Sequence, residues 1–309
     1  MLATHTIADA HCHFFSSGFL EILTRDRQDF PATGRAAAAA RFLGWDDPGP
    51  APDLARRWVA ELDEQGVDRA MLIASIPGDE ESVAAAVGAH PARFVGAFMF
   101  NPAAPDAAGR LERALSELRL RTVALFPAMH HYSLADPCVT PVFDAAQRHG
   151  AAVFVHCGAL TVGVRKRLGL ASPFDWRLGD PLAVAAVAVR YPTVPVIVPH
   201  FGAGFFRDAL MAADQCPNLL LDTSSSNRWM TYHPGLTLEA VFRQAVAVAG
   251  ADRLLFGTDS SFYPRGWQRA IYESQRTAMT AAGLGEADIA KILGGNFARV
   301  FGPDGARLE

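Results

Sequence analysis

Eight short apolar runs, each followed by a segment with helical spacing, constrain the fold of this chain more than any other feature. Strands that alternate with helices favour a parallel sheet covered by helices, and eight such units are typical of a closed barrel. We therefore predict an α/β fold, a (β/α)8 TIM barrel with a long insertion after strand 1. The predicted strands span residues 5–13, 69–74, 94–100, 122–126, 152–156, 194–200, 219–223 and 253–259. The predicted helices span residues 53–65, 79–90, 106–119, 139–149, 181–190, 205–215, 236–249, 267–282 and 286–300.

The insertion accounts for a length of 309 residues, somewhat above the roughly 250 of a typical barrel. Residues 14–52 interrupt the alternation, and long insertions of this kind are often functional, so we expect a lid-like segment. We expect one barrel domain over residues 1–309. An open doubly wound sheet is the alternative. Its nucleotide-binding form needs a glycine-rich turn after the first strand, where this chain has His-Cys-His-Phe-Phe at residues 11–15.

Composition argues against nucleic-acid binding, a disulfide framework, secretion and membrane insertion. The formal net charge is −4, which lacks the basic excess of a nucleic-acid-binding protein. The four cysteines are widely spaced and form no CxxC pair, so no disulfide framework is indicated. We find no secretory leader and no apolar run of about 18 residues. We therefore expect a cytoplasmic protein that binds neither nucleic acid nor membrane.

Five side chains that can bind a metal lie at the ends of predicted strands. His11 and His13 end the first strand, and residues two apart on a strand point to one face. His156 ends the fifth strand, His200 the sixth and Asp259 the eighth. Functional residues of such barrels gather at the C-terminal strand ends, so we expect these five to converge. Imidazole and carboxylate ligands suit Zn²⁺ or another divalent first-row metal.

Each of these residues also has a simpler explanation when it is taken alone. A histidine at a strand end is commonly an ordinary core or surface residue. An aspartate in the sequence Gly-Thr-Asp-Ser suits a turn or a helix N-cap. Convergence of all five on one rim favours the metal site. A barrel that binds a metal without turning over a substrate stays open as a further alternative.

The pattern resembles the amidohydrolase superfamily. The shared features are His-x-His on the first strand, His on the fifth, His-x-Gly on the sixth and Thr-Asp on the eighth. The closing segment Gly294–Phe301, Gly-Gly-Asn-Phe-Ala-Arg-Val-Phe, is also similar to the family's terminal segment. The resemblance is strongest to the amidohydrolase-related branch (amidohydrolase 2). That branch includes aminocarboxymuconate-semialdehyde decarboxylase and related decarboxylases, hydratases and lactonases.

The resemblance implies a role for each strand-end residue. His11, His13, His156 and Asp259 would bind the metal, and His200 would deprotonate or orient the metal-bound water. In hydrolytic members, the aspartate that matches Asp259 also passes a proton to the leaving group. Binuclear members use a carbamylated lysine on the fourth strand, where this chain reads Thr-Val-Ala-Leu-Phe-Pro. We therefore expect a single divalent ion, Zn²⁺. The resemblance also implies a homodimer.

Two reactions of a small organic substrate suit such a site. In the first, which we favour, a metal-bound hydroxide attacks an ester, lactone or amide carbonyl. In the second, an aromatic or conjugated carboxylic acid loses CO₂ without oxidation. A cation should then hold the carboxylate, and arginine is the usual choice. The candidate substrate contacts are Phe14, Arg228 and Arg265, which follow predicted strands one, seven and eight.

Overall fold

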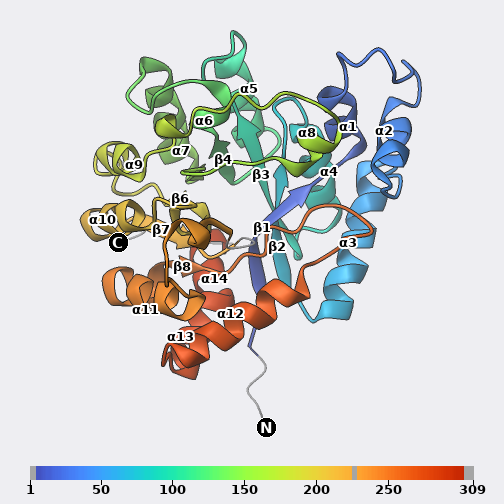
Figure 1. The fold of residues 1–309 in the computed structure, drawn as a ribbon. Helices are drawn as coiled ribbons and strands as arrows, with labels where there is room; N and C mark the ends of the chain where they lie inside the picture. The colour runs from blue at the N-terminus through green and yellow to red at the C-terminus, as the bar shows by residue number, and fades with distance from the viewer. Residues whose placement is uncertain (1–4, 225–227, 303–309) are drawn as a thin grey trace.

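The computed structural model of the chain describes residues 5–224 and 228–302, and its eight strands form one parallel sheet in sequential order. Figure 1 shows these strands at the centre of the molecule with the helices around them. The strands are β1 (Ala8–Phe14), β2 (Arg69–Ala74), β3 (Phe94–Phe100), β4 (Thr122–Leu125), β5 (Ala152–Val155), β6 (Val196–Val198), β7 (Leu219–Asp222) and β8 (Leu254–Leu255).

Hydrogen bonds between β1 and the chain after β8 close this sheet into a barrel. The backbone N–H of Ala10 donates to the carbonyl oxygen of Phe256 at 2.8 Å, and that of His13 donates to Ser260 at 2.7 Å. The predicted (β/α)8 barrel is therefore confirmed. Regular strand β8 is shorter than the predicted 253–259, because the residues that follow it meet β1 through an isolated bridge and single hydrogen bonds.

Fourteen α-helices lie in the described part of the chain, and most match the predicted segments within a few residues. They are α1 (Ser17–Leu23), α2 (Arg35–Leu43), α3 (Ala51–Gln65), α4 (Glu80–Ala89), α5 (Ala107–Ser116), α6 (Pro127–His130), α7 (Thr140–His149), α8 (Gly163–Arg167), α9 (Pro181–Ala188), α10 (Phe206–Gln215), α11 (Leu238–Ala249), α12 (Arg269–Ala281), α13 (Glu286–Ala290) and α14 (Asn296–Phe301). Short 3₁₀ turns include η3 (Pro199–Gly202) and η4 (Arg228–Tyr232).

The predicted helix 286–300 is interrupted. A π-helical turn, Lys291–Gly295, separates α13 from α14. Gly294 lies so close to the chain before β1 that an added Cβ would be 2.4 Å from the carbonyl oxygen of Thr6. The helical segment therefore approaches the barrel through a residue without a side chain.

Two apolar layers hold the barrel together. Side chains such as Ala10, Met71 and Phe154 fill its interior, and Phe297 and Phe301 of α14 belong to the same cluster. A second and larger cluster lies between the strands and the surrounding helices. This division follows from the alternation of side chains along each strand, which sends every second residue inward. None of the helices in the described ranges is long and apolar enough to cross a membrane.

The insertion after β1 forms helices α1 and α2, and it packs against the connection between β5 and α9. Phe19 and Leu20 of α1, Leu43 of α2 and Val164 and Leu168 in and after α8 belong to one buried cluster. Helix α8 lies in the connection between β5 and α9. The lid function of residues 14–52 stays a prediction.

Candidate metal centre

Three of the five predicted site residues bring their potential ligand atoms together. One such atom from each of His11, His13 and Asp259 lies within 4.8 Å of the other two. Oδ1 of Asp259 is 3.1 Å from Nε2 of His13 and 3.7 Å from Nε2 of His11. The backbone N–H of Asp259 donates to the carbonyl oxygen of His11 at 2.9 Å. The same backbone contacts that close the barrel therefore place Asp259 next to His11 and His13.

Hydrogen bonds assign the tautomers of both β1 histidines. Nδ1 of His11 donates to Oδ2 of Asp222 at 2.6 Å, since an ionised carboxylate can only accept. Nδ1 of His13 lies 2.7 Å from the hydroxyl of Ser75, and that hydroxyl donates to the carbonyl oxygen of Ile73. The Ser75 oxygen therefore accepts from His13. In its neutral form each of these rings therefore carries the lone pair on Nε2, which faces Asp259 as a metal ligand requires.

His200 lies beside His11, with their ring centroids 4.9 Å apart. It lies in η3, beyond the end of β6, so the predicted strand 194–200 ends early. Its Nδ1 is 3.0 Å from the carbonyl oxygen of Ser224, which can only accept, so the lone pair is on Nε2. The backbone of His200 is left-handed, with φ of +56°, and that of Asp259 has φ of +61°. Such strained residues cost about 1–3 kcal/mol each and gather at functional sites.

His156 follows β5 directly and borders this group. Its ring centroid is 5.3 Å from that of His200 and 5.3 Å from that of Phe126. It is not one of the three residues whose ligand atoms lie within 4.8 Å of one another. Its Nδ1 is buried and has no hydrogen-bond partner among the described residues. A buried nitrogen of this kind needs a partner, and a metal ion would provide one.

The carboxyl group of Asp259 stays ionised at neutral pH. Burial opposes its ionisation, but the contact with Nε2 of His13, which favours the carboxylate whenever that ring is protonated, and the nearby His11 and His200 outweigh it. Together they hold the pKa of Asp259 well below its usual range. An ionised carboxylate next to imidazole lone pairs is a ready ligand for a divalent cation.

Burial keeps three of the four imidazoles neutral. It lowers the pKa of His13, His156 and His200, and the neighbouring histidines lower it further. Burial also disfavours the charged form of His11, but the charge and hydrogen bond of Asp222 outweigh it and raise the pKa of His11. Metal ligation needs the neutral imidazole, so three of these rings are already in the required state.

Sequence reasoning missed the side chains that support these rings. Asp222, Ser75 and Ser224 were assigned no role, although Asp222 and Ser75 orient the β1 histidines and Ser224 contacts His200. One signal was present, because Asp222 is an acidic residue that ends the apolar run Leu-Leu-Leu-Asp of β7. Gly257 lies against the same group, and an added Cβ would be 2.7 Å from Oδ1 of Asp222.

Asp9 is a second buried carboxylate below the centre, and it joins β1 to the chain after β8. Its oxygens accept from the hydroxyl of Thr258 at 2.5 Å, from Nε1 of Trp267 at 2.7 Å and from the backbone N–H of His11 at 2.9 Å. These donors lie on both sides of the seam that closes the barrel. Asp9 therefore fixes the positions of both segments that carry the candidate ligands.

An aromatic wall stands next to the histidine pair. The ring of Phe15 is 5.7 Å from that of His13 and stacks on Phe19 at 4.2 Å. Trp45 stacks on Phe262 at 3.8 Å, and both are within stacking distance of Phe15. The insertion and the loop after β8 thus provide an apolar surface beside the candidate centre, as binding sites for small organic molecules commonly have.

The three predicted substrate contacts differ in position. Phe14 is fully buried in the layer between strands and helices, so its position does not support contact with a substrate, and its neighbour Phe15 lies beside the centre instead. Arg228 begins η4 and is exposed. Arg265 lies in the loop after β8, and its charge is near enough to His13 to help burial lower the pKa of that histidine.

The residues present fit a single divalent metal ion. Two Nε2 lone pairs and an ionised carboxylate face one another, and the buried Nδ1 of His156 lacks a partner among the described residues. The two lysines of the chain lie elsewhere, Lys166 in α8 and Lys291 in the π-helical turn. The assignment of individual ligands stays a prediction.

Comparison with known proteins assigns the chain to a family. A model of the amidohydrolase family matches residues 8–302 of the chain, which is nearly its whole length. That range includes all five predicted site residues and both segments of the barrel seam.

Solved structures with the same fold include two decarboxylases and a protein described as a putative hydrolase. The 5-carboxyvanillate decarboxylase of Sphingomonas paucimobilis is 20% identical with a TM-score of 0.64, and the match covers 96% of this chain and 98% of that one. The 5-carboxyvanillate decarboxylase of Novosphingobium aromaticivorans, complexed with manganese, is 15% identical with a TM-score of 0.64, covering 96% and 95%. A putative 2-pyrone-4,6-dicarboxylic acid hydrolase from Pseudomonas putida is 16% identical with a TM-score of 0.60, covering 96% and 97%. At these identities the likeness establishes the fold.

Proposed function

Because the chain belongs to the amidohydrolase family, we propose that it is a metal-dependent hydrolase of a small organic ester, lactone or amide. The family includes enzymes of both hydrolase and carboxy-lyase type, as the structural neighbours illustrate. The observation that carries the proposal is the facing arrangement of the Nε2 atoms of His11 and His13 with the ionised carboxylate of Asp259. We propose one Zn²⁺ ion held by these three residues and His156.

The chain's own groups divide the work of hydrolysis. When bound, the metal ion supplies Lewis-acid activation of water and of the substrate carbonyl. Nε2 of His200 carries a lone pair, so it accepts a hydrogen bond from the attacking water and orients it. Asp259 takes the proton of that water and passes it to the leaving group.

The apolar wall and the buried surroundings complete the site. Phe15, Trp45 and Phe262 would hold the carbon frame of the substrate beside the centre. Asp222 and Ser75 keep the imidazoles in position, so their Nε2 atoms need no rearrangement during the reaction.

The first experiment is elemental analysis of three purified proteins, joined to an activity screen with esters, lactones and amides. The wild type should hold about one metal ion per chain, and Asp259→Ala should lose it. His200→Ala should keep the metal while hydrolysis falls by at least about 100-fold. His149→Ala, at the exposed end of α7, is the matched control. A metal-free wild type after reconstitution, or an active His200→Ala variant, would contradict the proposal.

One observation favours decarboxylation as the second candidate function. Arg265 is an exposed cation in the loop after β8, near enough to affect the pKa of His13, and we propose that it holds the carboxylate of an aromatic or conjugated acid. If the protein is a decarboxylase, such acids should release CO₂. The KM should rise in Arg265→Gln, because the substrate carboxylate would lose its cationic partner. Release of CO₂ with no hydrolysis of any ester, lactone or amide would replace the first function by the second. Metal retention without either activity would leave the non-catalytic barrel.

Assembly and location are also part of the proposal. We propose that the protein acts on its small-molecule substrate as a homodimer in the cytoplasm. Light scattering of the metal-loaded protein would test the dimer, because a single species at the monomer mass would exclude it.

A further inference from the structure

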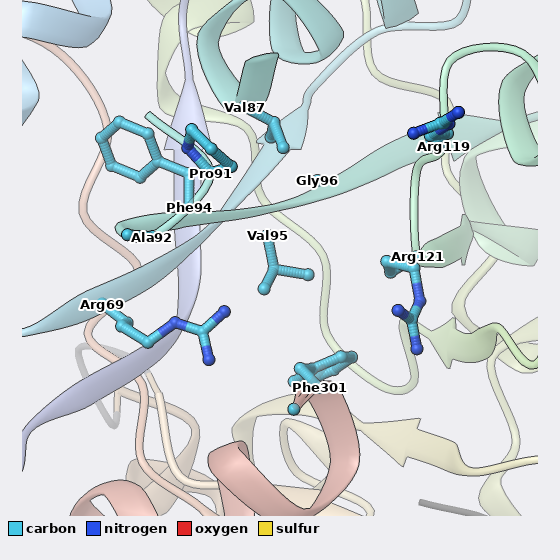
Figure 2. A pocket seen from close by; sticks show the side chains of 11 residues that line it. Arg69, Val87, Pro91, Ala92, Phe94, Val95, Gly96, Arg119, Arg121 and Phe301 are labelled. Carbon is cyan, nitrogen blue, oxygen red and sulfur yellow. The ribbon is translucent and has the colours of Figure 1, made fainter. Parts of the chain in front are cut away.

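A basic cavity lies at the opposite end of the barrel from the metal centre. It has a volume of about 480 Å³, within the range of sites that bind small organic molecules. Arg69, Arg119 and Arg121 line it together with apolar side chains (Figure 2). Arg69 is the first residue of β2, whereas Ser75, which contacts His13, directly follows the end of that strand. Six residues of extended strand place the two sites about 20 Å apart.

The three guanidinium groups have no carboxylate or other hydrogen-bond acceptor within residues 5–224 and 228–302. Neither a salt bridge nor a side-chain hydrogen bond to a described residue involves any of them. Nε of Arg69 and Nε of Arg121 are buried without an acceptor in this part of the chain. By contrast, Arg93 and Arg110 both pair with carboxylates. Buried donors of this kind normally have acceptors, and an anion in the cavity would provide them.

The backbone fixes the arginines around the cavity. The N–H of Arg121 donates to the carbonyl oxygen of Gly96 at 2.8 Å, which holds the start of β4 against β3. Arg69 lies over the ring of Phe297 at 5.3 Å from its centroid, a contact that orients the guanidinium group. In Figure 2 the guanidinium groups of Arg69 and Arg121 lie on either side of Val95. Burial also lowers the pKa of Arg69, as expected for a cation that lacks an anionic neighbour.

The other walls of the cavity are apolar. Phe94 and Val95 of β3 and Phe301 of α14 line it beside the arginines. Three planar cationic groups around an apolar chamber match a molecule with several carboxylates on a hydrocarbon frame. Each arginine fork can hold a carboxylate through two hydrogen bonds, and the frame can contact the phenylalanines and valine.

We propose that this cavity binds a small organic polycarboxylate, separately from the substrate of the metal centre. The ligand would neutralise the cluster of like charges and supply the missing acceptors. Because it would bind the folded state alone, it would stabilise the fold according to its concentration. This inference does not depend on which reaction the metal centre catalyses.

The test is calorimetric titration of the metal-loaded full chain with benzene-1,3,5-tricarboxylate. We expect saturable binding of one molecule per chain, and at least about tenfold weaker binding by Arg69→Gln/Arg121→Gln, because the variant lacks the charged donors that would hold two of the carboxylates. Arg265→Gln, beside the metal centre, is the matched control and should bind as the wild type does. Absence of binding at millimolar probe, or loss only in Arg265→Gln, would overturn the proposal.

Two further variants keep the test decisive. If the double variant does not fold, Arg119→Gln replaces it, because that arginine is exposed in the connection between α5 and β4. Unchanged affinity in Arg119→Gln would then reject the site. A chain ending at Gly302, which also lines the cavity, distinguishes a ligand from the following segment. Probe binding seen only in this shortened chain would overturn the proposal, because residues 303–309 would then be the occupant.

Discussion

Nδ1 of His11 lies 2.6 Å from Oδ2 of Asp222, although 211 positions separate the two residues in the chain. Both side chains are almost fully buried. The other oxygen of Asp222 accepts from the backbone N–H of Ser224 at 2.6 Å, so the carboxylate has a donor on each side. One buried side chain thus sets the orientation of a candidate metal ligand and the path of the chain after β7.

Asp222→Asn should weaken metal binding without unfolding the protein. The amide has a single acceptor oxygen, so either His11 or the N–H of Ser224 loses its acceptor. We expect the metal affinity to fall by about 10–100-fold, the usual effect of losing such a supporting residue. Competition with a chelator measures it. Asp26→Asn removes an exposed carboxylate as control, and equal affinities in the two variants would contradict the role of Asp222.

Gly257→Ala should disturb the same group by steric conflict. The added Cβ would be 2.7 Å from Oδ1 of Asp222 and 3.0 Å from Cβ of His11. We expect a loss of about 1–3 kcal/mol in the free energy of unfolding, together with weaker metal binding. Gly109→Ala in α5 is the control, because nothing lies within 4 Å of its Cβ. That helical substitution should add up to about 1 kcal/mol of stability, so a stable Gly257→Ala protein with normal affinity would contradict the close approach.

Asp79→Asn should change how stability depends on pH. Burial raises the pKa of Asp79 to about 6 from an ordinary value of 3.8, despite hydrogen bonds from Ser16 and Ser82. The folded state therefore binds this proton more tightly than the unfolded state does. The stabilisation is complete below pH 3.8 and is lost as the pH rises through about 6.

The asparagine variant lacks this titration. Relative to wild type, its unfolding free energy should rise between pH 4 and 7 by up to about 3 kcal/mol, the equivalent of a shift of roughly two pKa units. Chemical denaturation at several pH values measures this difference. A difference that stays constant across the range would show that Asp79 titrates normally.

Trp267→Phe should destabilise the barrel seam. The substitution keeps an aromatic ring but removes the Nε1 donor that lies 2.7 Å from Oδ2 of the buried Asp9. That oxygen keeps its hydrogen bond from Thr258 but loses the second one, a net loss of about 0.5–1.5 kcal/mol. Trp176→Phe is the matched control, since its Nε1 donates at 3.3 Å from a side chain that is 40% exposed. Equal unfolding free energies for the two variants would refute the role of Trp267.

The fold could be predicted because its signals are local. Apolar runs such as residues 69–74 and 94–100 and the intervening helical spacing reflect neighbouring residues, and both strands have the predicted bounds. The rule that strand ends meet at one rim then placed His11, His13 and Asp259 together. The strands after the fifth are shorter than predicted, because loop hydrogen bonds replace the ladder there.

The supporting contacts could not be predicted from local patterns. The partners of His11 and His13 are Asp222 and Ser75, at separations of 211 and 62 positions, and nothing in the sequence near either histidine specifies them. The left-handed backbone of His200 also has no sequence signal, because residues other than glycine seldom adopt a positive φ. The arginine cavity depends on how the starts of β2 and β4 approach α14, which only the assembled barrel determines.

The seam between β1 and the chain after β8 makes assembly of the candidate centre a late event in folding. Asp9 contacts Thr258 across 249 positions, and the candidate ligands His13 and Asp259 lie on the same two segments. Contacts this distant require closure of a very long loop and form slowly. During synthesis, a nascent chain that has not yet exposed its last strand has neither a closed barrel nor a complete ligand set. Metal uptake would therefore report that synthesis and folding are both finished.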